Sequence, residues 1–213
     1  MVVVKFHTPG VFCISGATGS GKTFWVFNLL KEKHSLFSDP PQRILYCYSI
    51  WQPIFHSMEN DLGVVFHQGL PTSEDIFKHS KEGEHTLICL DDLQHEVVNS
   101  QTMEKLFTQL SHHCCISVLF LNQNLFYQGK YARTLSLNAA YTVLLKNHRN
   151  IQQIGILSRQ IGKGNLVVEA YKDCIQQPFG YLIVDLHPKT EDDFQLRTNI
   201  FSHEQPMVIY KTI

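Results

Sequence analysis

The segment from Gly16 to Thr23 constrains the fold of this chain more than any other. It matches the Walker A pattern GxxxxGK[ST] in full, with the residues Gly16, Ala17, Thr18, Gly19, Ser20, Gly21, Lys22 and Thr23. An apolar run precedes it and a helical pattern follows, which is the context in which such a loop binds phosphate. Its glycines let backbone N–H groups surround an anion at the start of a helix. The alternative, a glycine-rich turn that binds nothing, does not account for this context.

A second motif completes the expected site. Two carboxylates follow the apolar run Leu87–Leu90, in the manner of a Walker B strand. We expect Lys22 to reach the β- and γ-phosphates of ATP, and Thr23 to bind Mg²⁺. Asp91 would hold Mg²⁺ through water, and Asp92 would position the attacking water or accept its proton. The alternative is that both carboxylates cap the following helix. Such a pair favours ATP hydrolysis over nucleotide storage.

A polar tip on another strand provides a further candidate. The apolar run Ser117–Leu121 ends in Asn122, Gln123 and Asn124. An amide at this position can sense the γ-phosphate or orient water, and we assign that role to Gln123. The alternative is that these amides only begin a turn.

Short apolar runs alternate with helical patterns along the chain. Several of the runs are continuously apolar, as a parallel sheet covered on both faces requires. The expected strands are Val11–Ser15, Arg43–Ser49, Gly63–His67, Thr86–Asp91, Ile116–Asn122, Tyr141–Lys146 and Tyr181–Leu186. Apolar residues at helical spacing predict helices around Met103–Leu110 and Val167–Cys174. We therefore predict an α/β fold, a P-loop NTPase with a mainly parallel, doubly wound central sheet.

Length and composition limit the remaining possibilities. The 213 residues suffice for one α/β domain, which we place at residues 1–188. Residues 189–213 are more polar, and we expect them to form a C-terminal appendage. The six cysteines form no CxxC pair, which favours a reducing, intracellular compartment. No apolar stretch is long enough to span a membrane, so we also expect a soluble protein. The net charge of -1 offers no global field for nucleic acid, and any DNA contact must be local.

The order of these motifs resembles the FtsK/HerA superfamily of DNA-pumping ATPases. More narrowly, residues 120–138, FLNQNLFYQGKYARTLSLN, resemble the genome-packaging ATPases of Polinton-type elements, adintoviruses and virophages. The poxvirus packaging ATPase is a more distant relative. The resemblance covers roughly residues 10 to 190, and it is the 120–138 stretch that makes it specific. It implies a RecA/FtsK-like core.

The resemblance also implies a function and partners. Packaging ATPases of this kind are expected to assemble into a ring of identical subunits that drives double-stranded DNA into a preformed capsid. The implied location is the host nucleus or the site of virion assembly, and the implied protein partner is a capsid or portal protein. A neighbouring subunit's arginine would complete each nucleotide site. Many relatives carry that arginine before the fourth core strand, whereas this chain has none between Asp92 and Ile116. Arg133 and Arg149 are the candidates instead; for each, surface charge or DNA contact is the alternative.

Two loops are candidates for DNA contact. Lys130 and Arg133 flank an aromatic residue in Gln128–Arg133, and Lys163 lies in the glycine-rich Gln160–Asn165. Phosphate contacts of this kind suit a motor that must move any sequence; solvated turns are the alternative.

Two other functions of the chain remain open besides DNA translocation. One is a nucleotide-gated assembly factor that acts on a protein partner. The other is a small-molecule kinase, which usually needs a lid with paired arginines.

Overall fold

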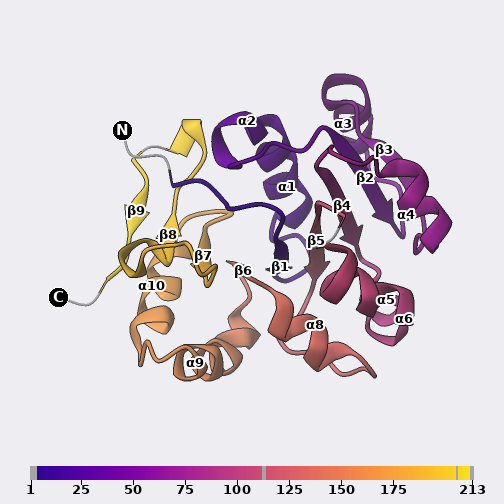
Figure 1. Cartoon of the computed structure of the whole chain (residues 1–213). Coiled ribbons are helices and arrows are strands. Elements are labelled where there is room, and N and C mark those ends of the chain that lie inside the picture. The colour runs from indigo at the N-terminus through magenta and orange to yellow at the C-terminus, as the bar shows by residue number, and fades with distance from the viewer. Residues whose placement is uncertain (1–3, 112–113, 205, 212–213) are drawn as a thin grey trace.

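A nine-stranded sheet, counted over the described residues 4–111, 114–204 and 206–211, runs through the computed structural model of the chain (Figure 1). From edge to edge it contains β3 (Val65–Gln68), β2 (Arg43–Tyr48), β4 (Thr86–Asp91), β5 (Ile116–Asn122), β1 (Val11–Ser15), β6 (Tyr141–Leu145), β7 (Tyr181–Asp185), β8 (Leu196–Thr198) and β9 (Val208–Ile209). The strands from β3 to β6 are parallel, and β7 to β9 add antiparallel pairs. The predicted α/β fold with a mainly parallel sheet is confirmed.

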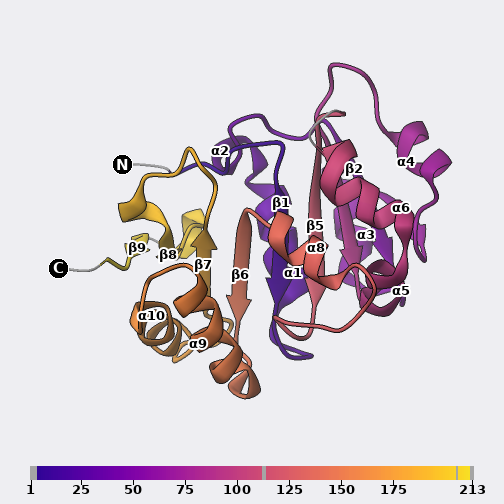
Figure 2. The ribbon, with the colours of Figure 1, turned by 60° about the horizontal axis from the view of Figure 1, so that its bottom comes forward.

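Helices cover both faces of the sheet, which explains its continuously apolar central strands. Every residue of β1, β4 and β5 is buried. One face packs against α1 (Lys22–Lys31), α2 (Lys33–Leu36) and α3 (Ile54–Leu62). The other packs against α4 (Ser73–His79), α5 (Gln94–Asn99), α6 (Gln101–Lys105), the π-helix η1 (Leu106–Leu110), α8 (Ala132–Asn138), α9 (Ile151–Gln160) and α10 (Leu166–Cys174). Figure 2 shows this arrangement from a second side.

Both predicted helical stripes face the core. Val167, Ala170, Tyr171 and Cys174 are the buried residues of α10. The other stripe begins in α6 and continues through η1, and its first three members are fully buried. Because the spacing i, i+3, i+4 places side chains on one side of a helix, the sequence pattern was sufficient to orient these elements.

The chain after residue 189 contributes to the sheet that carries the rest of the fold. It forms the 3₁₀ turns η3 (Asp192–Phe194) and η4 (Ser202–Glu204) as well as β8 and β9. The side chains of Arg197 on β8 and Asp185 on β7 form an ion pair at 2.8 Å, and neither is exposed. Ser202 donates to the carboxylate of Glu32 near the end of α1. The segment expected to be an appendage therefore supplies two strands and buried contacts.

The carboxyl ends of β1, β4, β5 and β6 lie at one edge of the sheet, because these strands are parallel. Their connecting segments meet there, which is where α/β sheets bind ligands. Among the described residues, no helix combines the length and apolar character needed to cross a bilayer.

Candidate nucleotide-binding site

The turn from β1 into α1 has the backbone of a phosphate-binding loop. Gly19 and Gly21 have φ angles of 76° and 94°, a region that side-chain-bearing residues rarely adopt. Gly21 is the N-cap of α1, and no side chain caps this helix end. The first backbone N–H groups of a helix have no carbonyl partner within it. They are therefore available to an anion at the loop, as the sequence predicted.

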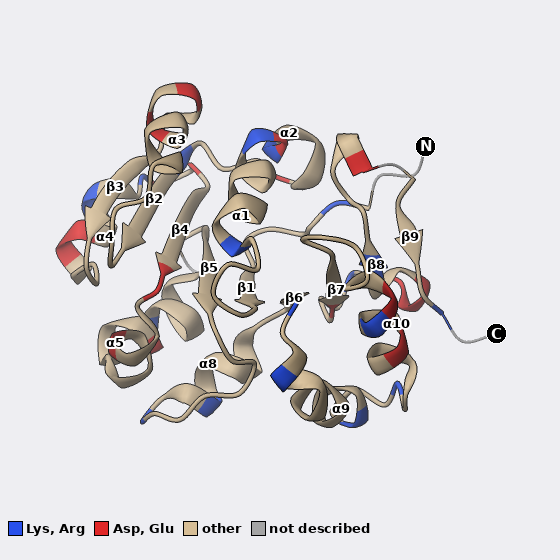
Figure 3. Cartoon of the chain, turned by 180° about the vertical axis from the view of Figure 1, so that it is seen from behind, with Lys and Arg blue, Asp and Glu red and all other residues tan. Residues whose placement is uncertain are grey.

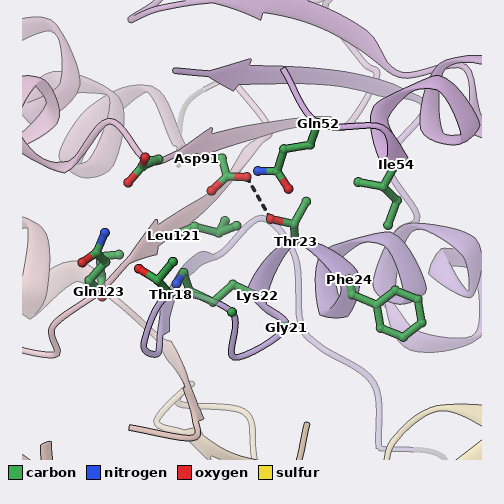
Figure 4. A pocket seen from close by; sticks show the side chains of 13 residues that line it. Thr18, Gly21, Lys22, Thr23, Phe24, Gln52, Ile54, Asp91, Leu121 and Gln123 are labelled. Atoms are coloured by element: carbon green, nitrogen blue, oxygen red, sulfur yellow. Dashed lines mark hydrogen bonds between the residues drawn. The ribbon is translucent and has the colours of Figure 1, made fainter. Parts of the chain in front are cut away.

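A cavity of about 460 Å³ opens beside this loop (Figure 4). Its lining residues come from four separate parts of the sequence: Thr18, Gly19, Gly21, Lys22, Thr23, Phe24, Gln52, Ile54, Asp91, Asp92, Leu121, Asn122 and Gln123. The structure thus brings the phosphate loop, the paired carboxylates and Gln123 together. Their chemical roles remain predictions.

Lys22 lies within the curve of the loop. Its ammonium donates to the backbone carbonyl oxygens of Gly16 and Ala17, at 2.7 and 3.1 Å. Burial lowers the pKa of Lys22 from its ordinary value, and the nearby carboxylates of Asp91 and Asp92 oppose that shift. The two hydrogen bonds hold the end of the Lys22 side chain at the loop, where phosphates would lie.

Asp91 is the buried acid of the site, with 4% of its surface exposed. Its Oδ2 accepts hydrogen bonds from the Tyr46 hydroxyl at 2.7 Å and the Thr23 hydroxyl at 3.2 Å. Burial raises the pKa of Asp91, and these two hydrogen bonds oppose the rise. The geometry therefore holds a carboxylate and a hydroxyl side by side at the floor of the cavity.

Asp92 differs from its neighbour in both exposure and backbone. It is exposed, and its φ angle of 57° lies in the left-handed region, which aspartate tolerates better than most residues. This sharp change of direction follows a strand that is buried throughout. As a result, two consecutive carboxylates serve one cavity from different positions, one buried and one accessible to water.

The two amide side chains at the end of β5, Asn122 and Gln123, also differ in exposure. Gln123 is exposed and lines the cavity, as its predicted role requires. Asn122 also lines it but is only 2% exposed, and both polar atoms of its side chain lack a hydrogen-bond partner. A buried amide normally has such partners. Asn122 is therefore a second candidate for the sensing role, one that the sequence analysis did not choose.

The two candidate arginines lie outside the lining of this cavity. Arg133 is exposed on α8 and lines a different pocket, with Phe126 and Leu137. Arg149 is exposed in the 3₁₀ turn η2 (His148–Asn150), which follows β6 at the edge that carries the phosphate loop. Neither side chain completes the site within its own chain, and only Arg149 follows a strand at that edge.

The two loops proposed for DNA contact are both at the surface. Lys130 is exposed, its ammonium 5.0 Å from the ring centre of Tyr131. Its loop packs on α5, since a Cβ on Gly129 would lie 2.3 Å from Val98. Lys163, half-buried, lies between α9 and α10. The structure leaves these ammonium groups available without showing what they contact.

Three further residues escaped the sequence analysis because distant parts of the chain bring them to the site. In the sequence Tyr46 is one residue of an apolar strand, and only the pairing of β2 with β4 brings its hydroxyl to Asp91. Gln52 follows β2 in an irregular segment, and Figure 4 shows its amide beside Thr23 and Asp91. Asn147 donates to the Gln123 carbonyl at 3.2 Å and accepts from the Arg149 backbone N–H at 3.1 Å. No local pattern could have identified them.

The residues present fit a nucleoside triphosphate with Mg²⁺. Mg²⁺ prefers oxygen ligands and usually takes one or two from the protein, the rest from phosphates and water. The Thr23 hydroxyl and the Asp91 carboxylate are close enough to serve one ion. Lys22 and the first turn of α1 supply positive charge and N–H donors for the phosphates.

Neither a model of a known protein family nor a curated protein sequence matches this chain. Its structure is similar to that of the genome packaging NTPase B204 from Sulfolobus turreted icosahedral virus 2, solved in complex with ATP-gammaS. The TM-score is 0.54 at 11% sequence identity, and the match covers 96% of this chain and 97% of that one. The ATPase DotB of Legionella pneumophila gives a TM-score of only 0.35 at 14% identity, covering 79% of this chain and 53% of DotB. The chain therefore has the α/β fold of a P-loop packaging NTPase.

Proposed function

We propose that this chain is an ATP-driven translocase that packages double-stranded DNA of a viral or virus-like genome into a capsid. The observation that carries the proposal is one cavity lined both by the phosphate loop, through Thr18, Gly19 and Gly21–Thr23, and by Asp91 and Asp92. Support for the packaging role comes from the fold, which matches a genome packaging NTPase over nearly the whole length of both chains.

Each side chain of the cavity has a specific role in this proposal. Lys22 and the N-terminus of α1 bind the phosphates and offset their charge. Thr23, and Asp91 through water, would hold Mg²⁺, which would supply positive charge to offset that of the phosphates. Tyr46 positions the Asp91 carboxylate through its hydrogen bond. These residues orient the nucleotide but do not attack it.

Asp92 and the amides of β5 act on the water. Asp92 is the accessible acid of the cavity and would orient the attacking water or accept its proton. Asn122 or Gln123 would hold the same water or sense the γ-phosphate. An arginine from a neighbouring subunit, Arg149 or Arg133, would offset the charge that develops during phosphoryl transfer. This last requirement ties hydrolysis to assembly of a homo-oligomeric ring.

The charge distribution supports contact with DNA. Residues 105–168 contain seven Lys and Arg residues and no Asp or Glu, although the whole chain carries a net charge of -1. Lys130, Arg133 and Lys163 belong to this stretch. Figure 3 shows its basic positions along α8 and α9 and the loops beside them. Such a surface can bind phosphates without reading sequence.

The finer assignment rests on the 120–138 stretch. Its resemblance to the packaging ATPases of Polinton-type elements, adintoviruses and virophages supports a place for this chain in that part of the FtsK/HerA superfamily. A capsid or portal protein is then the proposed protein partner.

The test is ATP hydrolysis by the purified chain, with and without linear double-stranded DNA. We expect DNA to stimulate hydrolysis, and we expect Lys22→Ala and Asp92→Asn each to abolish it, with losses of at least about a hundredfold. Lys31→Ala is the matched control for Lys22, because Lys31 ends the same helix and is exposed.

The other outcomes separate the alternatives. Hydrolysis that is indifferent to DNA but stimulated by a capsid or portal protein would favour a nucleotide-gated assembly factor. Phosphate transfer to a small acceptor would favour a kinase. An absence of nucleotide binding would overturn the proposal.

A further inference from the structure

A second pocket lies directly beside the phosphate loop. Its volume is about 350 Å³, and Gly21 and Phe24 line both it and the first cavity. The other side of the pocket comes from the turn before β7 and from the segment after β8, including Phe179, Asn199 and Glu204. A ligand whose phosphates occupy the loop could therefore continue into this pocket without leaving the surface.

Phe179 occupies a position that normally belongs to glycine. The Gly180 backbone N–H donates to the Gln177 carbonyl at 3.1 Å, which closes a turn with Pro178 second and Phe179 third. The φ angle of Phe179 is 59°, as the third position of a type II turn requires, and glycine or asparagine is usual there. A bulky side chain in this region costs conformational energy and is a feature found at functional sites.

The ring of Phe179 lies against the phosphate loop and remains largely uncovered. A Cβ on Gly21 would lie only 2.9 Å from Cδ1 of this ring, so the contact requires glycine at that position. Phe179 is nevertheless 62% exposed, and Phe24 is 51% exposed on α1. Figure 4 shows Phe24 on the side of Gly21 away from Gln123. Two exposed rings, Phe24 and Phe179, thus border the pocket next to Gly21.

We propose that this pocket binds the base and ribose of the nucleotide, with Phe179 stacking on the base. A planar heteroaromatic base is the ligand that an exposed ring beside a phosphate site fits, and stacking of this kind tolerates any base. The amides of Asn28 and Asn199 and the carboxylate of Glu204 supply polar groups in the same pocket. The C-terminal segment would then form one wall of the nucleotide site. This inference rests on the proposed function, because it assumes that the loop binds a nucleotide.

The experiment compares two ligands that share their phosphates. Binding of ATP and of inorganic tripolyphosphate, each with Mg²⁺, is measured by calorimetry for the full chain and for Phe179→Gly. Glycine removes the ring and suits the positive φ angle, so the turn should fold. We expect ATP to bind about tenfold more weakly and tripolyphosphate to bind unchanged. Phe179→Tyr should retain the affinity for ATP, and Phe77→Ala on α4, which removes another exposed ring, should alter neither ligand.

Each result distinguishes this inference from the proposed function. If the unaltered chain binds neither ligand, the proposed function fails. If it binds both and Phe179→Gly leaves ATP affinity unchanged, only the base pocket is wrong. Equal weakening of both ligands would mean that Phe179 acts by supporting the loop, and that result also overturns the stacking role.

Discussion

Asp91 shows how the environment of one residue determines its chemistry. A carboxyl at the end of a buried strand is disfavoured in its charged form, and burial accordingly raises its pKa. Tyr46 and Thr23 oppose this by donating hydrogen bonds to the same oxygen. The pKa of Tyr46 is in turn raised well above its usual value by burial and by the nearby carboxylate, so its hydroxyl remains a donor. These two hydrogen bonds favour the ionised form of Asp91 in an apolar setting.

Tyr46→Phe should therefore change the pH dependence of the site. Loss of one hydrogen bond to the carboxylate raises the pKa of Asp91 further, so Asp91 takes up its proton at a higher pH. Because Mg²⁺ binds the ionised form, the acidic limb of Mg²⁺-dependent ATP binding should move to higher pH. The measurement is ATP affinity across a pH series with and without Mg²⁺. Tyr48→Phe, two positions along from Tyr46, is the control and should leave the acidic limb of the pH profile unchanged. If Tyr46→Phe also leaves the acidic limb unchanged, Tyr46 does not influence the ionisation of Asp91.

At the scale of elements, the C-terminal strands are tied to the sheet by a buried ion pair. Arg197 and Asp185 are both fully buried, and the Arg197 side chain also donates to the Phe194 carbonyl at 2.7 Å. The Arg197 guanidinium lies 5.2 Å from the ring centre of Phe6. This pair connects β8 to β7 and to the N-terminal segment. Removing one member would leave the other charge buried and uncompensated.

Arg197→Met should consequently destabilise the whole domain. We expect the free energy of unfolding to fall by about 3–5 kcal/mol, as for other buried pairs that lose one partner. Chemical denaturation monitored by far-UV circular dichroism measures this. Lys211→Met removes one member of the exposed pair with Asp193 and should cost less than about 1 kcal/mol. If the two variants were equally stable, the C-terminal strands would not be part of the cooperative fold.

At the scale of the whole molecule, charge is segregated along the chain. The basic residues 105–168 contrast with the remainder, which is acidic in sum. Figure 3 shows acidic positions on α3, α4, α5 and α10, and basic positions along α8 and α9. A nearly neutral protein can in this way present a basic surface to DNA while its overall charge gives little attraction.

DNA contact by this surface should show in its salt dependence. For the double variant Lys130→Ala/Arg133→Ala we expect weaker binding to linear duplex DNA of any sequence. The slope of log affinity against log salt concentration should fall by about two. Fluorescence anisotropy over a salt series measures both quantities. Lys31→Ala/Lys78→Ala makes the same charge change at exposed positions elsewhere and should leave the slope unaltered. An equal slope for both double variants would exclude the Gln128–Arg133 loop from the interface.

Much of the fold was predictable because its signals are local. Apolar runs, several of them continuous, located the strands β1 to β7, and the spacing of Val167, Ala170, Tyr171 and Cys174 oriented α10. The short strands β8 and β9 were missed, since they have three and two residues and pair only at the edge of the sheet. β8 also carries a charged residue, Arg197, which is buried in the sheet only because it pairs with Asp185 on β7.

The sequence by itself determined the phosphate loop, the strand before it and the helix after it, because glycine spacing and apolar runs act over a few residues. It also placed Asp91 and Asp92 at the end of a buried strand. Only the tertiary structure decided that Tyr46 holds Asp91, that Asn122 is buried at the cavity, and that Phe179 meets Gly21. Those contacts join residues far apart in the chain, and their partners are set by strand order and helix packing, which no local pattern encodes.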